Sequence, residues 1–209
     1  VHIIGGGIGG MEAARVLKLR GHKPVIHEKG SQLGGTFIAA SAESYKGKLR
    51  QLLAWYRRQM EQMEIEVHLN EEISGTEQFG SDPVIIATGA VPRLPKNVPG
   101  YERMIEACDY LNGAEVGETV AVIGGGLTGC EIAYELALQG KKPVIVEMKD
   151  DLIAQKGVCL ANSSYLREWF ALHKVPVYLE TTLKEVGEKA IVCRGKDGTE
   201  TEIPCDSVI

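Results

Sequence analysis

The sequence predicts an α/β fold that is built twice from one strand–glycine–helix–strand unit and ends in a small β-meander. An apolar strand runs into a glycine-rich turn at Gly5 and again at Gly124, and a helical pattern follows each turn. Each unit then closes with an apolar strand and a glutamate, Glu28 in the first and Glu147 in the second. One shift of 119 residues aligns both units from the glycines to the glutamate. The chain therefore carries an internal repeat, and we expect two related domains.

The first unit has the residue order of a dinucleotide-binding site. Gly5, Gly7 and Gly10 stand in the order G-x-G-x-x-G. The first glycine allows a tight turn, the second lets the backbone approach a pyrophosphate, and the third lets the helix pack close to the strand. The helix that follows offers free N–H groups and a partial positive charge to that pyrophosphate. Glu28 falls near the spacing of the acid that binds the ribose hydroxyls, so we predict a Rossmann-like site.

The second unit repeats each of these positions. Gly124, Gly126 and Gly129 align with the three glycines of the first unit, and Glu147 aligns with Glu28. The alternative is a pair of glycine-rich turns that bind nothing, but no other role requires so many glycines in one turn. We therefore predict two dinucleotide sites on one chain.

A glycine-rich loop follows Glu28 and is the next candidate for contact with a ligand. It runs from Lys29 to Thr36 and contains the pair Gly34 and Gly35. Glycines let a backbone lie close to a pyrophosphate or a ribitol chain, whereas the alternative is an ordinary surface turn. We favour the ligand-binding interpretation because the loop directly follows Glu28, the glutamate expected to bind the ribose.

A long helix is predicted over about 44–63, followed by a strand. Three arginines, Arg50, Arg57 and Arg58, share the side that faces away from the core, and we expect them to be solvated, with a docking surface as the alternative. The core-facing stripe consists of Leu49, Leu52, Leu53, Tyr56, Met60 and Met63. Alternating apolar and polar residues then predict a strand over 65–69.

Proline residues mark the division of the chain. The run Val84–Ile86 predicts a buried strand, and the prolines between 92 and 99 then interrupt any regular pattern. We place the domain boundary there, with one domain over 1–98 and the other over 99–209.

The second domain is expected to contain further helices and to end in antiparallel strands. Helical patterns cover about 106–111 and 161–172. Ile191–Cys193 is expected to pair with Thr201–Ile203 around a turn at Lys196–Gly198. A β-meander that covers the far side of a parallel sheet fits this pattern.

Composition and charge narrow the class of protein. The net charge of −5, with no basic tract, argues against a nucleic-acid partner, and no apolar run is long enough to cross a bilayer. The five cysteines form no C-x-x-C pair, so we expect buried or half-buried thiols in a reducing cytoplasm, with no metal site. The five histidines are not expected to share a site. Since the chain lacks an initial methionine and stops in an apolar run, we expect a piece of a longer polypeptide.

These motifs together resemble the flavoprotein reductases that bind two dinucleotides. The chain is most similar to the C-terminal half of the old-yellow-enzyme-related NADH:flavin oxidoreductases, the 2-enoate reductase and 2,4-dienoyl-CoA reductase group. The resemblance covers the whole chain. It rests on GGGIGGMEAARVLKLRGH, EKGSQLGG, VIIATGAVPR, GGGLTGCEIAYELALQGKKPVIVEM and the final IPCDSVI.

The resemblance implies which dinucleotide each unit holds. In that family the first glycine unit binds FAD, and the second binds the nicotinamide dinucleotide on a domain inserted into the FAD domain, whose last strand and helix would follow Ile209. Glu28 would bind the FAD ribose. Two further segments would lie near FAD: the loop residues Lys29, Gly34, Gly35 and Thr36, and the turn Ala87, Thr88 and Gly89. Relatives usually carry glutamine where this chain has Thr36, which departs from the family pattern at this flavin contact.

The resemblance also implies an activity and a missing partner. Full-length members resemble a triose-isomerase-type barrel with FMN and often a four-iron cluster, joined to a half like this one. FMN, the iron–sulfur cluster and the barrel domain are therefore expected only in the rest of the parent chain. The implied chemistry is hydride transfer from NADH to FAD, for onward reduction of an enoate or enoyl-type substrate in the barrel.

The implied chemistry requires no general acid or nucleophile, so we name no catalytic residue. Glu131 is the nearest candidate, because similar reductases place a carboxylate close to the nicotinamide. The alternative, favoured by its repeat partner Glu12, is an acid that suits the first turn of a helix. Glu147 indicates NADH rather than NADPH, because a carboxylate accepts hydrogen bonds from free ribose hydroxyls and repels a 2′-phosphate. Lys149 is close enough to soften that repulsion.

Other flavoprotein reductases share this pattern, and cysteine placement separates some of them. Disulfide reductases need C-x-x-x-x-C soon after the loop at Gly34, where this chain has Thr36–Ser41 and no thiol, so disulfide exchange is excluded. An electron-transfer subunit similar to the small subunit of glutamate synthase remains an alternative. So does a dinucleotide-binding or docking module without turnover.

Overall fold

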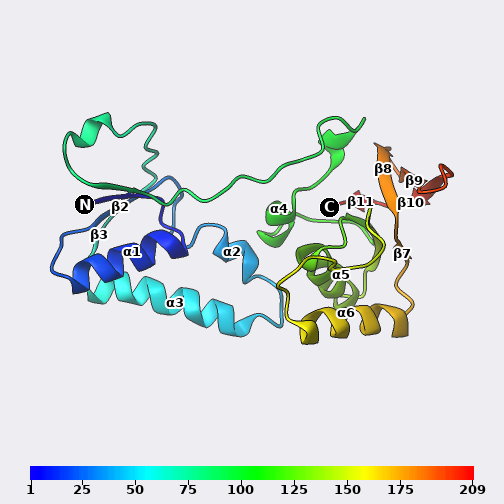
Figure 1. Cartoon of the computed structure of the whole chain (residues 1–209), viewed down its shortest axis with the longest axis horizontal. Coiled ribbons are helices and arrows are strands. Elements are labelled where there is room, and N and C mark those ends of the chain that lie inside the picture. The colour runs from blue at the N-terminus through cyan, green and yellow to red at the C-terminus, as the bar shows by residue number, and fades with distance from the viewer. The chain divides into compact units, whose positions relative to one another are not determined.

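The computed structural model describes residues 1–209, and the chain divides into two compact units, Val1–Val91 and Pro92–Ile209. The division lies in the same proline-containing segment as the expected boundary. Val98 is buried among core residues of the second unit. Figure 1 labels many of the elements of the two units, which are described separately below.

The first unit is a parallel four-stranded sheet with the strand order β3-β2-β1-β4. Two long helices cover one face of the sheet (Figure 1). Ile3 and Ile26 point from the sheet into the core between them, where they meet Met11 and Met60. The elements are β1 (His2–Ile4), α1 (Ile8–Leu19), β2 (Val25–Glu28), α2 (Phe37–Ala40), α3 (Gly47–Gln62), β3 (Glu66–Leu69), η1 (Glu77–Phe79) and β4 (Val84–Ile86).

Several expectations for this unit are confirmed and others are wrong. Helix α3 begins at Gly47, three residues later than expected, and the short elements α2 and η1 were not foreseen because they are too short to show a periodic pattern. Leu53 is buried, but its neighbour Leu52 is 41% exposed. One residue advances a helix by more than a quarter of a turn, so both leucines cannot face the same core.

Strand β4 is not the buried strand that its apolar sequence suggested. It pairs with β1 on one side and forms the edge of the sheet on the other. Val84 and Ile85 are half-buried, and Ile86 is 70% exposed. The apolar run reports β-propensity correctly, but burial depends on what covers the strand.

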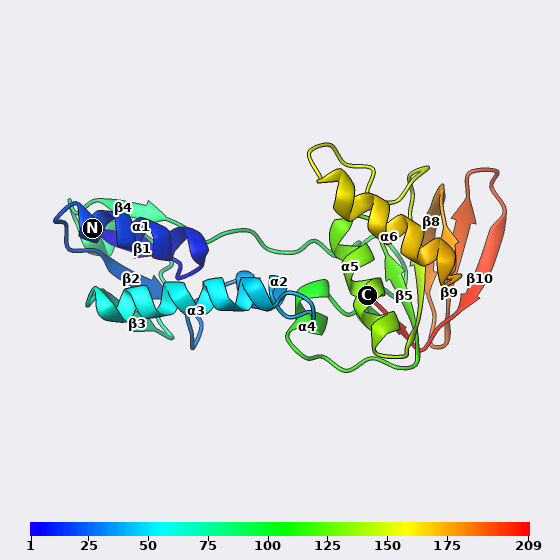
Figure 2. The ribbon, with the colours of Figure 1, turned by 90° about the horizontal axis from the view of Figure 1, so that it is seen from below.

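The second unit has the same parallel sheet with an additional antiparallel layer. Its strand order is β11-β5-β6-β7, with α5 and α6 on one face (Figure 2). The antiparallel sheet β8–β10 packs on the other face, which confirms the expected β-meander. The elements are η2 (Tyr101–Arg103), α4 (Ala107–Leu111), β5 (Thr119–Ile123), α5 (Leu127–Leu138), β6 (Lys142–Val146), α6 (Leu160–Leu172), β7 (Val177–Tyr178), β8 (Thr181–Val186), β9 (Ala190–Gly195), β10 (Glu200–Pro204) and β11 (Ser207–Val208).

Alternation along β5 divides its side chains between two cores. Val120 and Val122 face the helices and join Phe170 of α6. Ala121 faces the β-meander, where it meets Ile191 and Ile203. The predicted pairing of β9 with β10 is confirmed, since Cys193 lies opposite Thr201, and Ile191 lies opposite Ile203.

The internal repeat extends further than the sequence alone suggested. The shift of 119 residues covers the first two strands and the helix between them, and a shift of 110 then lays α6 and β7 on α3 and β3. Left-handed residues support this alignment, because Glu64 (φ 49°) corresponds to Lys174 (φ 54°), and Asn70 (φ 57°) corresponds to Glu180 (φ 48°). The two units are therefore variants of one β-α-β-α-β design.

Candidate dinucleotide sites

The glycine turn of the first unit can be built only with glycine at two of its positions. Gly5 has φ +107°, a left-handed conformation that side chains disfavour. A Cβ atom on Gly10 would lie 1.9 Å from the carbonyl oxygen of Gly5. Gly7 has no neighbour within 4 Å of its Cβ position, so that side of the turn is open. The turn thus packs tightly against its own helix and leaves room for a ligand beyond Gly7.

The second unit reproduces this geometry. Gly124 has φ +107°, and a Cβ atom on Gly129 would lie 1.9 Å from the carbonyl oxygen of Gly124. The residues that precede the two helices are extended alike, with ψ −175° at Gly7 and −178° at Gly126. Neither helix has an acidic residue in its first turn or a side-chain cap, so the N–H groups there can receive an anion.

The acid of the first unit is held by backbone donors. Glu28 ends β2 and is 9% exposed. Its Oε2 accepts a 2.6 Å hydrogen bond from the N–H of Gly6, and its Oε1 accepts one of 2.6 Å from the N–H of Gly30. A carboxylate oxygen can accept a second hydrogen bond. Glu28 is therefore fixed beside the glycine turn with acceptor capacity for ribose hydroxyls.

Glu147 has the same arrangement in the second unit. It follows β6 and is 7% exposed. Its Oε2 accepts from the N–H of Gly125 at 2.6 Å, and its Oε1 accepts from the N–H of Lys149 at 2.8 Å. Burial, together with the negative charge of Glu147, raises the pKa of the Cys130 thiol to about 12. Cys130 thus stays protonated and donates to the carbonyl of Gly125.

The loop after Glu28 lies against the first glycine turn. The N–H of Gly34 donates to the carbonyl of Gly6 at 2.8 Å, and a Cβ atom on Gly35 would lie 3.1 Å from Cα of Gly7. Lys29 and Thr36 are exposed at the two ends of this loop. The structure thus brings the sequence-predicted loop to the sequence-predicted turn through backbone contacts.

The turn after β4 reaches the same place. Ala87 donates its N–H to the carbonyl of Ile4, and a Cβ atom on Gly5 would lie 2.4 Å from the carbonyl oxygen of Ala87. Thr88 and Gly89 follow and are exposed. Three segments of the first unit, the glycine turn, the loop at Gly34 and the turn at Ala87, therefore converge.

Glu131 does not lie in the first turn of its helix. Helix α5 begins at Leu127, and α1 begins at Ile8, so Glu131 and its repeat partner Glu12 both fall in the second turn. Glu12 forms an ion pair with Arg15, with Nε and Oε2 2.7 Å apart. The interpretation of both acids as first-turn residues is wrong, because each acid is the fifth residue of its helix.

The expectation that the histidines form no group is wrong for three of the five. His2, His27 and His68 lie on the neighbouring strands β1, β2 and β3, on the sheet face away from α1 and α3. His2 Nδ1 lies 2.9 Å from His27 Nε2, and His27 Nδ1 lies 2.6 Å from Glu71 Oε2. Phe79 stacks on His2, with 4.1 Å between ring centroids. These residues are far apart in sequence, and only the strand order brings them together.

Two of the three arginines on α3, the exposed Arg50 and the half-buried Arg57, bind backbone carbonyls of preceding loops. Arg50 Nη1 donates to the carbonyls of Ser41 and Glu43 at 2.7 Å each. Arg57 donates to the carbonyl of Leu33. Arg58 is exposed, as expected. Periodicity identifies the side of the helix correctly, but it does not show which loops that side meets.

The cysteines and the helices add three findings. All five cysteines are free; Cys130, Cys193 and Cys205 are buried and Cys108 is half-buried, whereas Cys159 is exposed, contrary to expectation. No group of three or more His, Cys, Asp or Glu residues is arranged to hold a metal ion. None of the helices combines the length and the apolar character that crossing a bilayer requires.

The fold and the paired sites define a protein with two Rossmann-like dinucleotide-binding units. The family model for pyridine nucleotide-disulphide oxidoreductases matches residues 1–209, and the chain belongs to this family. The family binds FAD and a pyridine nucleotide, and the chain is a module of this flavin oxidoreductase type.

Known relatives confirm the resemblance to the 2-enoate reductase group. The chain is 37% identical over 213 residues to a cinnamate reductase of Clostridium sporogenes, covering 100% of this chain and 32% of the relative. It is 37% identical over 218 residues to an NADH oxidase of Thermoanaerobacter brockii, covering 100% and 33%. A 2-naphthoyl-CoA reductase solved in complex with 2-naphthoyl-CoA has a TM-score of 0.88 and 25% identity, covering 99% and 32%. The chain thus spans about a third of the length of these relatives.

Proposed function

We propose that the first unit binds FAD, that the second unit binds NADH, and that hydride passes from NADH to FAD. The observation that carries this proposal is the pair of equivalent glycine turns, each with a buried glutamate held against it. The first turn is open at Gly7, and at Gly126 only Gln155 Oε1 comes within 4 Å of the Cβ position. Both helices begin without an acidic residue in the first turn, which fits two pyrophosphates. Membership of a family that binds both cofactors supports the same conclusion.

The differences between the units support FAD in the first. At the shift of 119 residues, Gly34 and Gly35 correspond to Ile153 and Ala154. Gly35 exposes backbone beside Gly7, and the turn at Ala87 adjoins Gly5. We propose that these segments, with Lys29, Thr36, Thr88 and Gly89, form the FAD pocket. A site with more accessible backbone suits the longer, flavin-bearing cofactor.

We propose that Glu147 sets a preference for NADH over NADPH. Its Oε1 and Oε2 are already oriented by Lys149 and Gly125, so they can accept hydrogen bonds from both free ribose hydroxyls. Such bonds to a charged group contribute about 1.5–3 kcal/mol each. A 2′-phosphate would meet a buried negative charge instead. Lys149 is exposed and offers only a screened counter-charge.

The residues of this chain bind and orient, whereas the bound cofactors supply the hydride chemistry. Glu28 and Glu147 fix the two riboses, and the helix starts after Gly7 and Gly126 neutralise the pyrophosphates. Glu131, in the second turn of α5, is proposed to lie near the nicotinamide side of the second site. No general acid or nucleophile is required for the transfer.

We further propose that the electrons leave for a separate barrel domain of a longer protein. The names cinnamate reductase and 2-naphthoyl-CoA reductase suit an enoate or enoyl-type acceptor, and the chain covers only about a third of these relatives. FMN and an iron–sulfur cluster would belong to that barrel. Free cysteines fit a reducing cytoplasm.

The test is the visible absorption spectrum of the purified protein before and after anaerobic addition of NADH. A reductase is expected to show flavin bands that bleach with NADH. Flavin bands that NADH leaves unchanged would contradict hydride transfer and favour an electron-transfer subunit fed by another donor. A colourless protein that ignores FAD but gains thermal stability with NADH would reduce the function to dinucleotide binding.

A further inference from the structure

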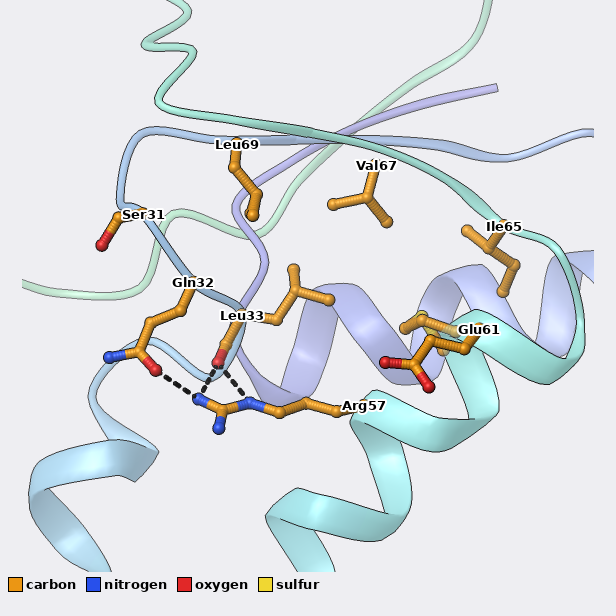
Figure 3. A pocket seen from close by; sticks show the side chains of 9 residues that line it. Ser31, Gln32, Leu33, Arg57, Glu61, Ile65, Val67 and Leu69 are labelled. Atoms are coloured by element: carbon orange, nitrogen blue, oxygen red, sulfur yellow. Dashed lines mark hydrogen bonds between the residues drawn. The ribbon is translucent and has the colours of Figure 1, made fainter.

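Each unit contains an arginine that holds the loop after its acid. In the first unit, Arg57 of α3 donates from Nε (2.9 Å) and Nη2 (2.5 Å) to the carbonyl oxygen of Leu33, and from Nη2 (3.0 Å) to Gln32 Oε1 (Figure 3). In the second unit, Arg167 of α6 donates from Nε (3.0 Å) and Nη2 (2.5 Å) to the carbonyl oxygen of Leu152. Its Nη2 also lies 2.8 Å from Asp151 Oδ2. We call this arrangement the arginine clamp.

The two clamps are equivalent although the chain between their parts differs in length. Gln32 and Leu33 correspond to Asp151 and Leu152 at the shift of 119 residues, and Arg57 corresponds to Arg167 at the shift of 110. The arginine lies 24 residues after its leucine in the first unit and 15 residues after it in the second. The same three contacts, two to the leucine carbonyl oxygen and one to the side chain before it, are therefore kept across different loop lengths.

Each clamp is connected to its acid through one leucine and one glycine. A Cβ atom on Gly6 would lie 2.4 Å from Cδ2 of Leu33, so that leucine covers the glycine. Leu152 covers Gly125 in the same way, at 2.5 Å. The N–H groups of these two glycines are the donors to Glu28 and Glu147.

Backbone pairing closes the connection. The N–H of Gly34 donates to the carbonyl of Gly6 at 2.8 Å, and the N–H of Ile153 donates to the carbonyl of Gly125 at 2.7 Å. In each unit the residue after the clamped leucine is therefore hydrogen-bonded to the glycine whose N–H group binds the glutamate. Loss of the arginine contact to the leucine carbonyl is therefore expected to weaken this backbone hydrogen bond.

We infer that Arg57 and Arg167 are positioning residues, each for the dinucleotide of its own unit. The inference rests on the function proposed above. Each guanidinium fixes the loop against the glycine turn, so the acid is already oriented when a ribose arrives. A loop that had to be ordered on binding would reduce the affinity by the entropy of that ordering. A forked guanidinium suits this task, because its Nε–H and Nη2–H groups reach one carbonyl oxygen and Nη2 also reaches a second acceptor beside it.

The test uses single variants with crossed readouts on the holoprotein. Arg57→Gln is expected to weaken FAD binding about tenfold, measured by flavin fluorescence after resolution and reconstitution, and to leave the KM for NADH of flavin-loaded protein unchanged. Arg167→Gln is expected to raise the KM for NADH about tenfold with kcat retained, and to leave FAD affinity unchanged. Arg58→Gln and Glu168→Gln, at the exposed positions that follow the clamp arginines on the same two helices, are the matched controls and should change neither value.

Lysine variants keep the inference testable if the glutamine variants fold poorly. Arg57→Lys and Arg167→Lys retain the charge but lose the fork, so each should show a smaller effect on its own dinucleotide alone. Equal losses of affinity for both dinucleotides, or unchanged affinities, would overturn the inference. The arginines would then only stabilise the fold. If the wild-type protein bound neither FAD nor NADH, the proposed function and the inference would fail together.

Discussion

Glu147 and Gly125, 22 residues apart in the sequence, are joined by a 2.6 Å hydrogen bond from the glycine N–H to the carboxylate. Glu28 and Gly6 make the same bond, at the same distance and the same separation, in the first unit. The turn that would contact the pyrophosphate therefore also orients the acid that would contact the ribose. One peptide group links the two recognition elements of each site, and the consequences of that link can be measured.

Replacing Glu147 with arginine should move the cofactor preference from NADH toward NADPH. The substitution removes the acceptor for two ribose hydroxyls and adds a cation that attracts a 2′-phosphate, so the ratio of kcat/KM values should change by at least tenfold. Flavin reduction followed by stopped-flow absorbance measures both cofactors. Glu28→Gln is the matched control, because it alters FAD retention without changing the ratio. An unchanged ratio of the kcat/KM values in Glu147→Arg would contradict the assignment of this glutamate to the nicotinamide dinucleotide.

Two adjacent glycines of α1 should respond oppositely to alanine. Gly10→Ala places a Cβ atom 1.9 Å from the carbonyl oxygen of Gly5, a backbone atom that cannot move aside, so the helix must shift and the free energy of unfolding should fall by roughly 1–3 kcal/mol. In Gly9→Ala the new Cβ atom meets nothing within 4 Å, and the position is helical. Alanine lowers the conformational entropy of the unfolded chain, so the free energy of unfolding should rise by about 0.5–1 kcal/mol.

Urea denaturation of both alanine variants without added dinucleotide measures the difference. Gly129→Ala should reproduce the loss in the second unit, because its Cβ atom would lie 1.9 Å from the carbonyl oxygen of Gly124. Equal stability of Gly9→Ala and Gly10→Ala would contradict the tight packing of helix on turn.

The histidine cluster predicts a stability optimum at mildly acidic pH for the first unit. The hydrogen bond from His27 lowers the pKa of Glu71 below 4.5, so its contribution is present above about pH 4.5 and is lost as the pH falls through the folded value. The hydrogen bond to Glu66 raises the pKa of His68 above 6.5, so its contribution is complete below about pH 6.5 and is lost as the pH rises through the folded value.

Thermal unfolding between pH 4 and pH 8 tests the two limits separately. Glu71→Gln should flatten the acid side of the Tm profile, and His68→Gln should flatten the alkaline side. Both groups are exposed, so high salt should reduce each effect. A His68→Gln profile that matches the wild type would show that this histidine adds nothing to the cluster.

Thiol reactivity should divide the cysteines by burial. Cys159 is exposed and should react rapidly with a chromogenic disulfide reagent in the native protein at pH 8. Cys130 should not react, because it is buried and its pKa of about 12 leaves almost no thiolate. Cys159→Ser should abolish the rapid phase, and denaturation should release all the remaining thiols. A fast phase that persisted in Cys159→Ser would place an accessible thiol elsewhere.

The sequence was most informative where a local rule fixes the structure. G-x-G-x-x-G turns and the acids after the second strands depend on residues within one short segment, and Gly5, Glu28, Gly124 and Glu147 lie as expected. The turn at Lys196–Gly198 likewise predicted that Ile191–Cys193 pairs with Thr201–Ile203, as β9 and β10 do.

Features that depend on distant segments could not be predicted. The arginine clamp needs the end of one loop and the middle of a later helix, and Arg57 alone looked like an ordinary surface residue. Strand order, which the sequence does not state, brings His2 beside His27. The signal that could have found the clamp is the repeat itself, because Arg57 and Arg167 become equivalent once the change in shift from 119 to 110 residues is recognised.

The outer edge of β4 bears on how this protein behaves in concentrated solution. Its unpaired backbone groups run beside Ile86, which is 70% exposed, and such an edge can serve as a template for the same strand in a second molecule. We therefore expect turbidity and light scattering of the 209-residue protein to grow with its concentration. Ile86→Lys should suppress this aggregation while leaving the sheet intact, because charged residues at a sheet edge block the addition of another strand.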